Sequence, residues 1–255
     1  MYSVIKKIFL SIVPKRFLFS HEKRIRSLYA LMYAGNRFQC NICHYHLKAF
    51  IHPNSELLCP ACGSIPRDRK LWQLLQNEFL AGMQHVLDFS PSRSIYREMK
   101  KRALTYISTD LSGDFISDQM YDITDITVQD ESFDLIICYH ILEHIDDDIK
   151  AMKELIRVLK SNGICLVQTP FKEGEIYEDE TIISPEQRVV HFGQSDHVRI
   201  YSVEGLKIRL QSVGFEVEVR NFVALPENIH GFKESETIFI CRKNIQNAFN
   251  NNLMQ

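Results

Sequence analysis

The chain has 255 residues, 45% of them hydrophobic, and a formal net charge of −2. This size supports one large hydrophobic core together with a small accessory module. No apolar run reaches the roughly 18 residues of a membrane-spanning helix, and the run IFLSIV ends at Pro14 without a cleavage site. We therefore expect neither a spanning helix nor a signal peptide, and a cytoplasmic protein.

The N-terminal segment, residues 1–35, is basic and amphipathic. Residues 1–72 have a charge balance of +9 and residues 73–255 one of −11. The basic residues 1–72 therefore either bind an anionic partner or carry charges that only solvate a helix. The pattern predicts two short helices broken at Pro14. This segment either contacts a membrane surface peripherally through residues 1–20 or docks on the body of the protein.

Residues 36–66 contain four of the seven cysteines: Cys40, Cys43, Cys59 and Cys62. Two Cys-x2-Cys pairs separated by fifteen residues supply four thiolates for a tetrahedral zinc ion. The odd number and the clustering favour metal thiolates in a reducing compartment over a disulfide framework. Because four thiolates complete the coordination shell, we predict a structural zinc in a small zinc-ribbon-like module.

Residues 67–84 have helical spacing and are predicted to connect this module to the next domain. Arg67 and Arg69 lie at its start. They are candidates for binding a phosphate or carboxylate of the substrate, with helix-surface charges as the alternative.

Residues 85–242 alternate between strand and helix patterns, which is typical of a mostly parallel α/β sheet with helices on both faces. The predicted strands are 85–89, 104–110, 120–124, 132–139, 163–171, 215–222 and 236–243. The predicted helices are 94–102, 146–160 and 202–214, with Gly163 as the stop after the second. The tail, residues 243–255, is expected to be flexible.

Three successive predicted strands carry acids at their ends: Asp88, Asp110 and Asp122. Open parallel sheets bind ligands at the carboxyl ends of their strands, and an acid after the second strand commonly accepts the ribose hydroxyls. Asp110 fits that position. The three acids together predict an adenosine site.

The stretches LTYISTDLS and YDITDITVQDESFDLIICYHILEHI, within residues 85–242, resemble class I S-adenosylmethionine-dependent methyltransferases of the type 11 group. The resemblance implies a Rossmann-like seven-stranded sheet and S-adenosyl-L-methionine as the cofactor. The residues that it assigns to the cofactor follow the first four strands: Asp88, Phe89, Ser90, Asp110, Leu111, Asp122, Ile123, Tyr139 and His140.

The turn after Asp88 departs from this family. Where the family usually has glycines, the chain has Phe89-Ser90-Pro91-Ser92. Glycine permits positive φ and close backbone approach, and proline removes a donor, so the methionine end is held differently or bound weakly. The chain also resembles a zinc-bearing subgroup in this turn and in HFGQSDHVRIY (191–201).

Methyl transfer needs alignment of the reacting groups, and a base only when the nucleophile is a hydroxyl or a similar group. The candidate catalytic residues are His140 and His197. The candidate substrate residues are Arg67, Arg69, His191, Asp196, His197 and Arg199. HILEH (140–144) also has the H-x-x-E-H form of a protease zinc site, but a strand end at His140 does not place both histidines on one helix.

The favoured function is a methyltransferase acting on a hydroxyl of a small molecule or saccharide, an acceptor that the subgroup resemblance suggests. An RNA methyltransferase that uses the basic zinc module is an alternative, which the acidic body and the pI of about 6.6 disfavour. A non-catalytic binding module that lost the cofactor is a third possibility, supported by the glycine-free turn.

Overall fold

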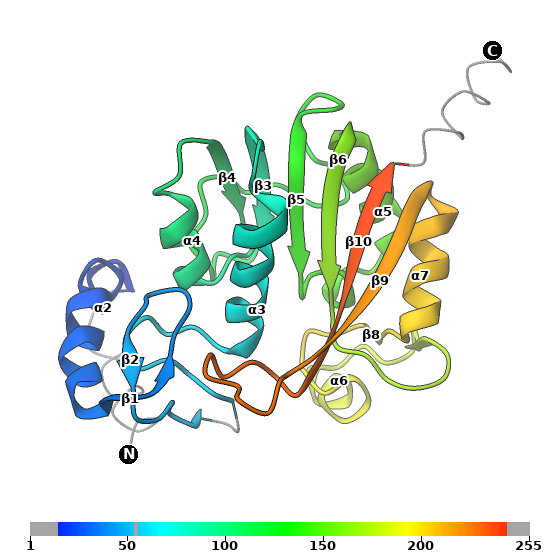
Figure 1. Ribbon diagram of the computed structural model, residues 1–255. Helices are drawn as coiled ribbons and strands as arrows, with labels where there is room; N and C mark the ends of the chain where they lie inside the picture. The colour runs from blue at the N-terminus through cyan, green and yellow to red at the C-terminus, as the bar shows by residue number, and fades with distance from the viewer. Residues whose placement is uncertain (1–14, 54–55, 244–255) are drawn as a thin grey trace, which may run out of the picture. The chain divides into compact units, whose positions relative to one another are not determined.

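The computed structural model describes residues 15–53 and 56–243, with side chains from His21 onward (Figure 1). These residues fall into two compact units. The cysteine unit comprises Met1–Ala81, Ser92–Lys101 and Val223–Glu236, and the sheet unit comprises Gly82–Pro91, Arg102–Phe222 and Thr237–Gln255.

The sheet has six strands, in the order β4-β3-β5-β6-β10-β9 (Figure 1). Their bounds are β3 His85–Phe89, β4 Thr105–Thr109, β5 Phe133–Tyr139, β6 Leu159–Gln168, β9 Phe215–Val223 and β10 Ser235–Lys243. β3 pairs in parallel with both β4 and β5, β5 pairs in parallel with β6, and β10 runs antiparallel to β6. The strand order therefore reverses beside β3, which makes the carboxyl ends of β3, β4 and β5 the expected place for a ligand.

Six strands are found in the described sheet where seven were predicted. The predicted strand at 120–124 is a turn instead, because Asp122 Oδ1 accepts hydrogen bonds from the Thr124 amide and hydroxyl, both at 2.8 Å. Beyond β4, an isolated parallel bridge between Thr109 and Gln119 lies where that strand was expected.

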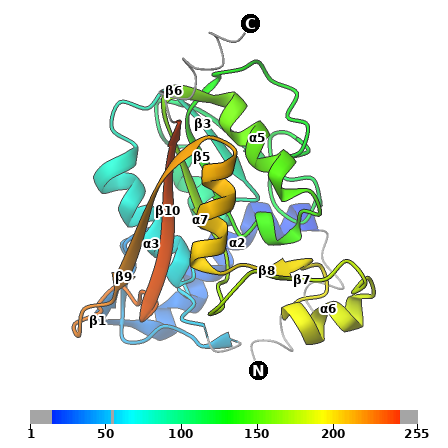
Figure 2. The same cartoon turned by 90° about the vertical axis from the view of Figure 1, so that its right-hand side faces the viewer.

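Helices α5 (Asp148–Val158) and α7 (Val203–Ser212) cover one face of the sheet (Figure 2). Asp147 and Ser202 cap their N-termini by accepting amides three residues ahead, at 2.9 and 3.1 Å. Their apolar sides meet the strands in one continuous core, which includes Met152, Leu155, Leu206, Leu210, Ile136 and Phe239. Helices on the second face stay a prediction.

The predicted helix stop at Gly163 is wrong. α5 ends at Val158, and β6 begins at once with Leu159. Leu159 pairs with Phe133 and Ile164 pairs with Leu135, so the extra residues of β6 form a bulge that contains Gly163. A Cβ on this glycine would lie 2.7 Å from the Leu159 side chain and 3.0 Å from a backbone carbonyl, so the bulge requires its small size.

The cysteine unit contains short elements. They are α2 Lys15–Ala30, η1 Leu31–Tyr33, β1 Ala34–Gln39, β2 His46–Leu47, α3 Pro66–Leu74, the π-helical turn η3 Leu75–Phe79, and α4 Arg93–Met99. β1 and β2 are antiparallel. α3 confirms the helix predicted after the cysteines, with Pro66 in its first turn and Asp68 accepting the Ile65 amide at 3.0 Å.

Of the two predicted N-terminal helices, the second corresponds to α2, and the first lies outside the described residues. The membrane contact predicted for residues 1–20 also falls on residues whose side chains lie outside the description. Among helices within 15–53 and 56–243, none has the length and apolar character needed to cross a bilayer.

Candidate functional site

Asp110 occupies the carboxyl end of β4, next to the reversal point of the sheet. Its side chain is buried, with 4% of the residue exposed. Oδ1 accepts the Ser90 hydroxyl at 2.7 Å, and Oδ2 accepts the Ser112 hydroxyl at 3.0 Å and the Phe115 amide at 3.2 Å. These contacts fix the carboxylate at the strand end. An ionised carboxylate offers about four acceptor sites, so it can still bind a further hydroxyl.

The glycine-free turn after β3 is held by hydrogen bonds to the end of β4. Ser90 adopts φ of 47°, in the left-handed region, where a non-glycine residue costs about 1–2 kcal/mol. Its amide donates to the Thr109 carbonyl at 2.7 Å while its hydroxyl bonds Asp110. A serine can therefore replace the usual glycine here, because two hydrogen bonds offset the backbone strain.

The other two predicted acids have different surroundings. Asp88 is buried within the sheet and accepts the Tyr106 hydroxyl at 2.9 Å. Asp122 is exposed, and the hydrogen bond from the Thr124 amide lowers the pKa of its carboxyl. Asp88 in β3 and Asp110 at the end of β4 therefore belong to two adjacent parallel strands, in which Asp88 pairs with Ser108.

Four apolar or aromatic residues were also predicted to contact the cofactor. Phe89 and Ile123 are buried in the core of the sheet unit, whereas Leu111 is 58% exposed. Tyr139, the last residue of β5, is half-buried. Leu111 and Tyr139 are therefore the two of this group with surface available to a ligand.

His140 follows β5 and turns the chain sharply. Its φ is 56°, and its amide donates to the Gln168 carbonyl at 2.8 Å. Its Nδ1 lies 3.1 Å from Oε1 of Glu143, in the 3-10 turn η4 (Leu142–His144), and its side chain is 20% exposed. Burial raises the pKa of Glu143, but the hydrogen bond and charge of His140 outweigh burial, so this pKa lies below its ordinary value. The pair therefore favours an ionised carboxylate that orients an imidazole.

Arg199, in the short strand β8 (Arg199–Ile200), anchors the turn after β5. Its guanidinium donates to the carbonyls of Leu142, Ile145 and Asp146 and to the Glu178 carboxylate. Only 5% of the residue is exposed. The substrate contact predicted for Arg199 stays a prediction.

The three remaining predicted residues of this segment lie near helix α6 (Pro185–Phe192). His191 is exposed, and its Nδ1 lies 2.6 Å from the Tyr177 hydroxyl, in β7 (Tyr177–Glu178). Asp196 is exposed, with Oδ2 3.2 Å from Nδ1 of His144. His197 is buried, and burial together with the charge of His144 lowers its pKa. His197 therefore favours the neutral imidazole.

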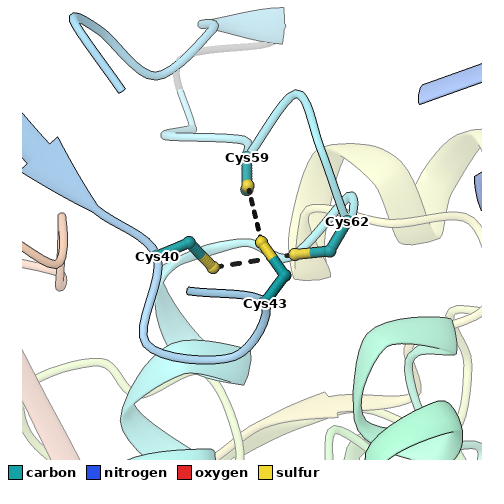
Figure 3. A group of neighbouring side chains, drawn as sticks. All are labelled: Cys40, Cys43, Cys59 and Cys62. Atoms are coloured by element: carbon teal, nitrogen blue, oxygen red, sulfur yellow. Dashed lines mark hydrogen bonds between the residues drawn. The ribbon is translucent and has the colours of Figure 1, made fainter. Parts of the chain in front are cut away.

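The four predicted zinc ligands converge in the cysteine unit (Figure 3). Their sulfurs all lie within 4.8 Å of one another. Cys40 and Cys62 are 3.6 Å apart and Cys43 and Cys59 are 3.8 Å apart, measured between Sγ atoms. A tetrahedral zinc with bonds of 2.3 Å requires sulfur separations of about 3.8 Å, so the donor set fits this ion.

Both cysteine loops have the same backbone design. The residue after each pair, His44 or Gly63, has positive φ and donates its amide to the carbonyl of the first cysteine, at 2.8 and 2.9 Å. Ser64 Oγ lies 3.4 Å from Cys40 Sγ and 3.2 Å from Cys62 Sγ. Such contacts orient thiolates and stabilise their charge.

Arg69 contacts the backbone beside the second cysteine loop and has a structural role. It is fully buried, and its guanidinium donates to four backbone carbonyls, those of Leu57, Ser64, His230 and Gly231. These contacts give the Arg69 guanidinium a structural role, and the predicted substrate contact stays a prediction. Arg67 is half-buried, and its substrate role stays a prediction.

The sequence interpretation did not include Glu143 and His144 in a site. Both contact a predicted site residue: Glu143 lies beside His140, and His144 stacks edge-on against His197, with ring centroids 4.6 Å apart. The H-x-x-E-H pattern was the available signal. Its two histidines do not share a helix, because His140 lies outside any helix and α5 begins only at Asp148.

The sheet order and the acid at the end of β4 define an α/β domain of the class that binds nucleotide cofactors at its strand ends. The sequence matches a family of methyltransferase domains over residues 68–219, more than half of the chain, and the chain belongs to that family. This membership gives the chain a methyltransferase domain, and S-adenosylmethionine-dependent methyltransferases are among the solved structures that share its fold.

Solved structures support the fold. A SAM-dependent methyltransferase from Archaeoglobus fulgidus aligns with 69% of this chain and 92% of its own, with a TM-score of 0.52 and 16% identity. The cyclase SpnF aligns with 88% of this chain and 94% of its own, with a TM-score of 0.52 and 14% identity. At these identities the likeness shows the fold alone, and the cyclase shows that this fold also serves other reactions.

One curated relative matches by sequence. An uncharacterized protein of Methanocaldococcus jannaschii is 30% identical over 87 residues, which are 34% of this chain and 36% of that protein. The match thus spans about a third of the relative's length.

Proposed function

We propose that the protein transfers a methyl group from S-adenosyl-L-methionine to a hydroxyl of a small molecule or saccharide. The observation that supports a hydroxyl as the acceptor is the pair formed by His140 and Glu143, just after β5. A hydroxyl must lose its proton during transfer, and an imidazole oriented by a buried carboxylate is suited to accept it.

Asp110 is the residue that we expect to hold the ribose of the cofactor. Its carboxylate is fixed by Ser90, Ser112 and Phe115 at the end of β4. Preorientation of this kind reduces the entropy lost when a ribose hydroxyl binds. Leu111, the next residue in the chain, offers exposed surface, Tyr139 at the end of β5 is half-buried, and Asp122 stays the candidate for the adenine amino group.

His140 is the better placed of the two predicted bases. Its side chain is 20% exposed, so its Nε2 can reach a bound substrate, while Glu143 stabilises the imidazolium that forms. His197 is 3% exposed, which makes direct contact with a substrate hydroxyl less favourable. The bound sulfonium would supply the electrophilic methyl group, and the protein would align acceptor and donor and exclude water.

The cysteine unit is proposed to hold a structural zinc. The support is the separation of the four sulfurs and the matched amide contacts of the two loops. The segment around the cysteines contains the two short strands β1 and β2, so such an ion would contribute stability that a small core does not supply.

Isothermal titration with S-adenosylmethionine tests the cofactor site. Asp110→Ala removes hydrogen bonds from a charged acceptor, each worth about 1.5–3 kcal/mol, so the affinity should fall at least tenfold. Asp114→Ala, in the same loop but exposed, is the matched control. Equal affinity in Asp110→Ala and the control would remove Asp110 from the site.

The acceptor class is tested separately, with mass spectrometry of methylated products from a library of hydroxyl compounds and saccharides. At saturating S-adenosylmethionine, His140→Gln should lose at least about a hundredfold in rate, the usual contribution of a general base. Methylation of amines only, with unchanged rate in His140→Gln, would refute the hydroxyl proposal.

A further inference from the structure

We propose that Glu143, His144 and His197 form a second metal site, which takes a divalent transition-metal ion such as zinc and leaves a position open for an oxygen ligand. All three residues belong to the sheet unit. None of the three is one of the four cysteines or a residue assigned to the cofactor, although Glu143 contacts His140.

The three side chains converge from two distant parts of the sequence. Glu143 and His144 lie in the turn η4, and His197 lies two residues before β8. Their ligand atoms all lie within 4.8 Å of one another. Ligands at about 2.0–2.2 Å from one ion are roughly 3–4 Å apart, so small rotations of these side chains bring them to coordination distance.

His197 has the protonation state that a ligand needs. Its Nδ1 lies 3.1 Å from the Phe192 carbonyl, which can only accept, so Nδ1 carries the proton and Nε2 has the lone pair. His197 Nε2 is buried and has no hydrogen-bond partner among the described residues. A histidine that ligates a metal commonly donates its second nitrogen to a carbonyl in this way.

Glu143 and His144 have matching features. Glu143 is 1% exposed; its Oε1 faces His140, and its Oε2 has no hydrogen-bond partner within the described chain. His144 Nδ1 lies 3.2 Å from the Asp196 carboxylate, which orients the ring and leaves Nε2 as the coordinating atom. A buried carboxylate oxygen without a partner is costly, and a cation would compensate it.

The turn that carries the two ligands is rigidly held. The Val198 amide donates to the Glu143 carbonyl at 2.9 Å, and Arg199 bonds three further carbonyls of residues 142–146. His197 is adjacent to these anchors in sequence. The site is therefore preorganised, and His144, with 28% of its side chain exposed, marks the access from solvent.

Two histidines and one carboxylate are the ligand set of many zinc sites that keep an open position. An ion here would bind an oxygen ligand and lower its pKa. That this oxygen is the acceptor hydroxyl, with His140 receiving its proton, rests on the proposed function. Binding of the metal itself does not.

Cobalt titration of the full-length, chelator-treated protein under reducing conditions tests the site. The cysteine ligands give an intense sulfur-to-cobalt band, whereas nitrogen and oxygen ligands give only weak visible absorption. We expect the wild type to bind two equivalents, one with the sulfur band and one without it. Zinc content by mass spectrometry should likewise be two per chain.

Glu143→Gln and His197→Ala should weaken the second equivalent at least tenfold and leave the sulfur band intact. Glu186→Gln and His191→Ala, exposed residues of the neighbouring helix α6, are matched controls that should bind both equivalents. Asp110→Ala should also bind both, so failure of the cofactor site is distinguishable. A wild type that binds one equivalent, with only the sulfur band, would overturn the proposal, whatever the variants do.

Discussion

Arg69 offers the sharpest test of how the cysteine unit is stabilised. Its guanidinium is fully buried and donates to four backbone carbonyls, two of them in the segment 223–236 and two beside the cysteine loops. It also lies over the Phe50 ring, 4.3 Å from the centroid. We predict that Arg69→Met lowers the unfolding free energy of this unit by far more than a typical substitution does.

The magnitude follows from the contacts. Four hydrogen bonds to a charged donor amount to roughly 6–12 kcal/mol at about 1.5–3 kcal/mol each. The net loss is smaller, because methionine avoids the several kcal/mol needed to desolvate a guanidinium. We expect the unfolding free energy of the unit to fall by about 3–5 kcal/mol, the usual effect of removing one partner from a buried charged network.

Trp72 provides the assay, since it is the single tryptophan of the chain and is buried in α3 of the same unit. Guanidinium unfolding followed by its fluorescence reports on this unit. Arg37→Met, at an exposed position of β1, should change stability by less than about 1 kcal/mol. Arg69→Lys, which keeps the charge but not the planar donors, should lose most of the stability. An Arg69→Met protein within 1 kcal/mol of wild type would falsify the reasoning.

Three further predictions concern other sites. Cys59→Ser should lower the zinc content by one equivalent per chain and destabilise the cysteine unit, because structural zinc contributes directly to folding. Glu236 is buried, and burial raises its pKa to about 7, from 4.5; the folded state therefore holds its proton more tightly. Stability should fall as pH rises from about 4.5 to about 7, and Glu236→Gln should recover up to about 3 kcal/mol above pH 7, measured by Trp72 fluorescence. Ser202→Ala removes the cap of α7 and should cost about 1 kcal/mol in thermal unfolding, while the exposed Ser212→Ala should cost almost nothing.

Each of these has a result that would contradict it. Unchanged zinc in Cys59→Ser would exclude a four-thiolate site. A Glu236→Gln protein whose stability differs from wild type by the same amount at pH 5 and pH 8 would show that this carboxyl does not titrate in that window. Equal unfolding temperatures for Ser202→Ala and Ser212→Ala would show that the observed cap contributes nothing.

Local sequence patterns predicted most of the helices and strands. The apolar run that forms β5, the capped amphipathic segment that forms α5 and the paired cysteines are all readable within a few residues, because periodicity, capping and knuckle spacing are short-range properties. The same local view failed at Gly163 and at 120–124. There, a bulge and a turn depend on which strand lies alongside and on side-chain contacts to the backbone.

The roles of the polar residues were harder to predict, because their partners are distant in sequence. Arg69 bonds a carbonyl 161 residues away, and Arg199 bonds one 57 residues away, so both look like free surface charges in the sequence. Asp110 could be identified from the sequence because parallel sheets bind ligands at the carboxyl ends of their strands, and the order of the predicted strands shows where those ends fall.

The sequence by itself determined the order of the elements, the set of four clustered cysteines and the acid at the end of β4, since each depends on neighbours along the chain. Only the tertiary structure decided that His197 meets Glu143 and His144, and that two predicted arginines serve the scaffold. The burial of a polar side chain and its hydrogen-bond partners depend on the folded chain, because residues far apart in sequence pack around it and exclude water.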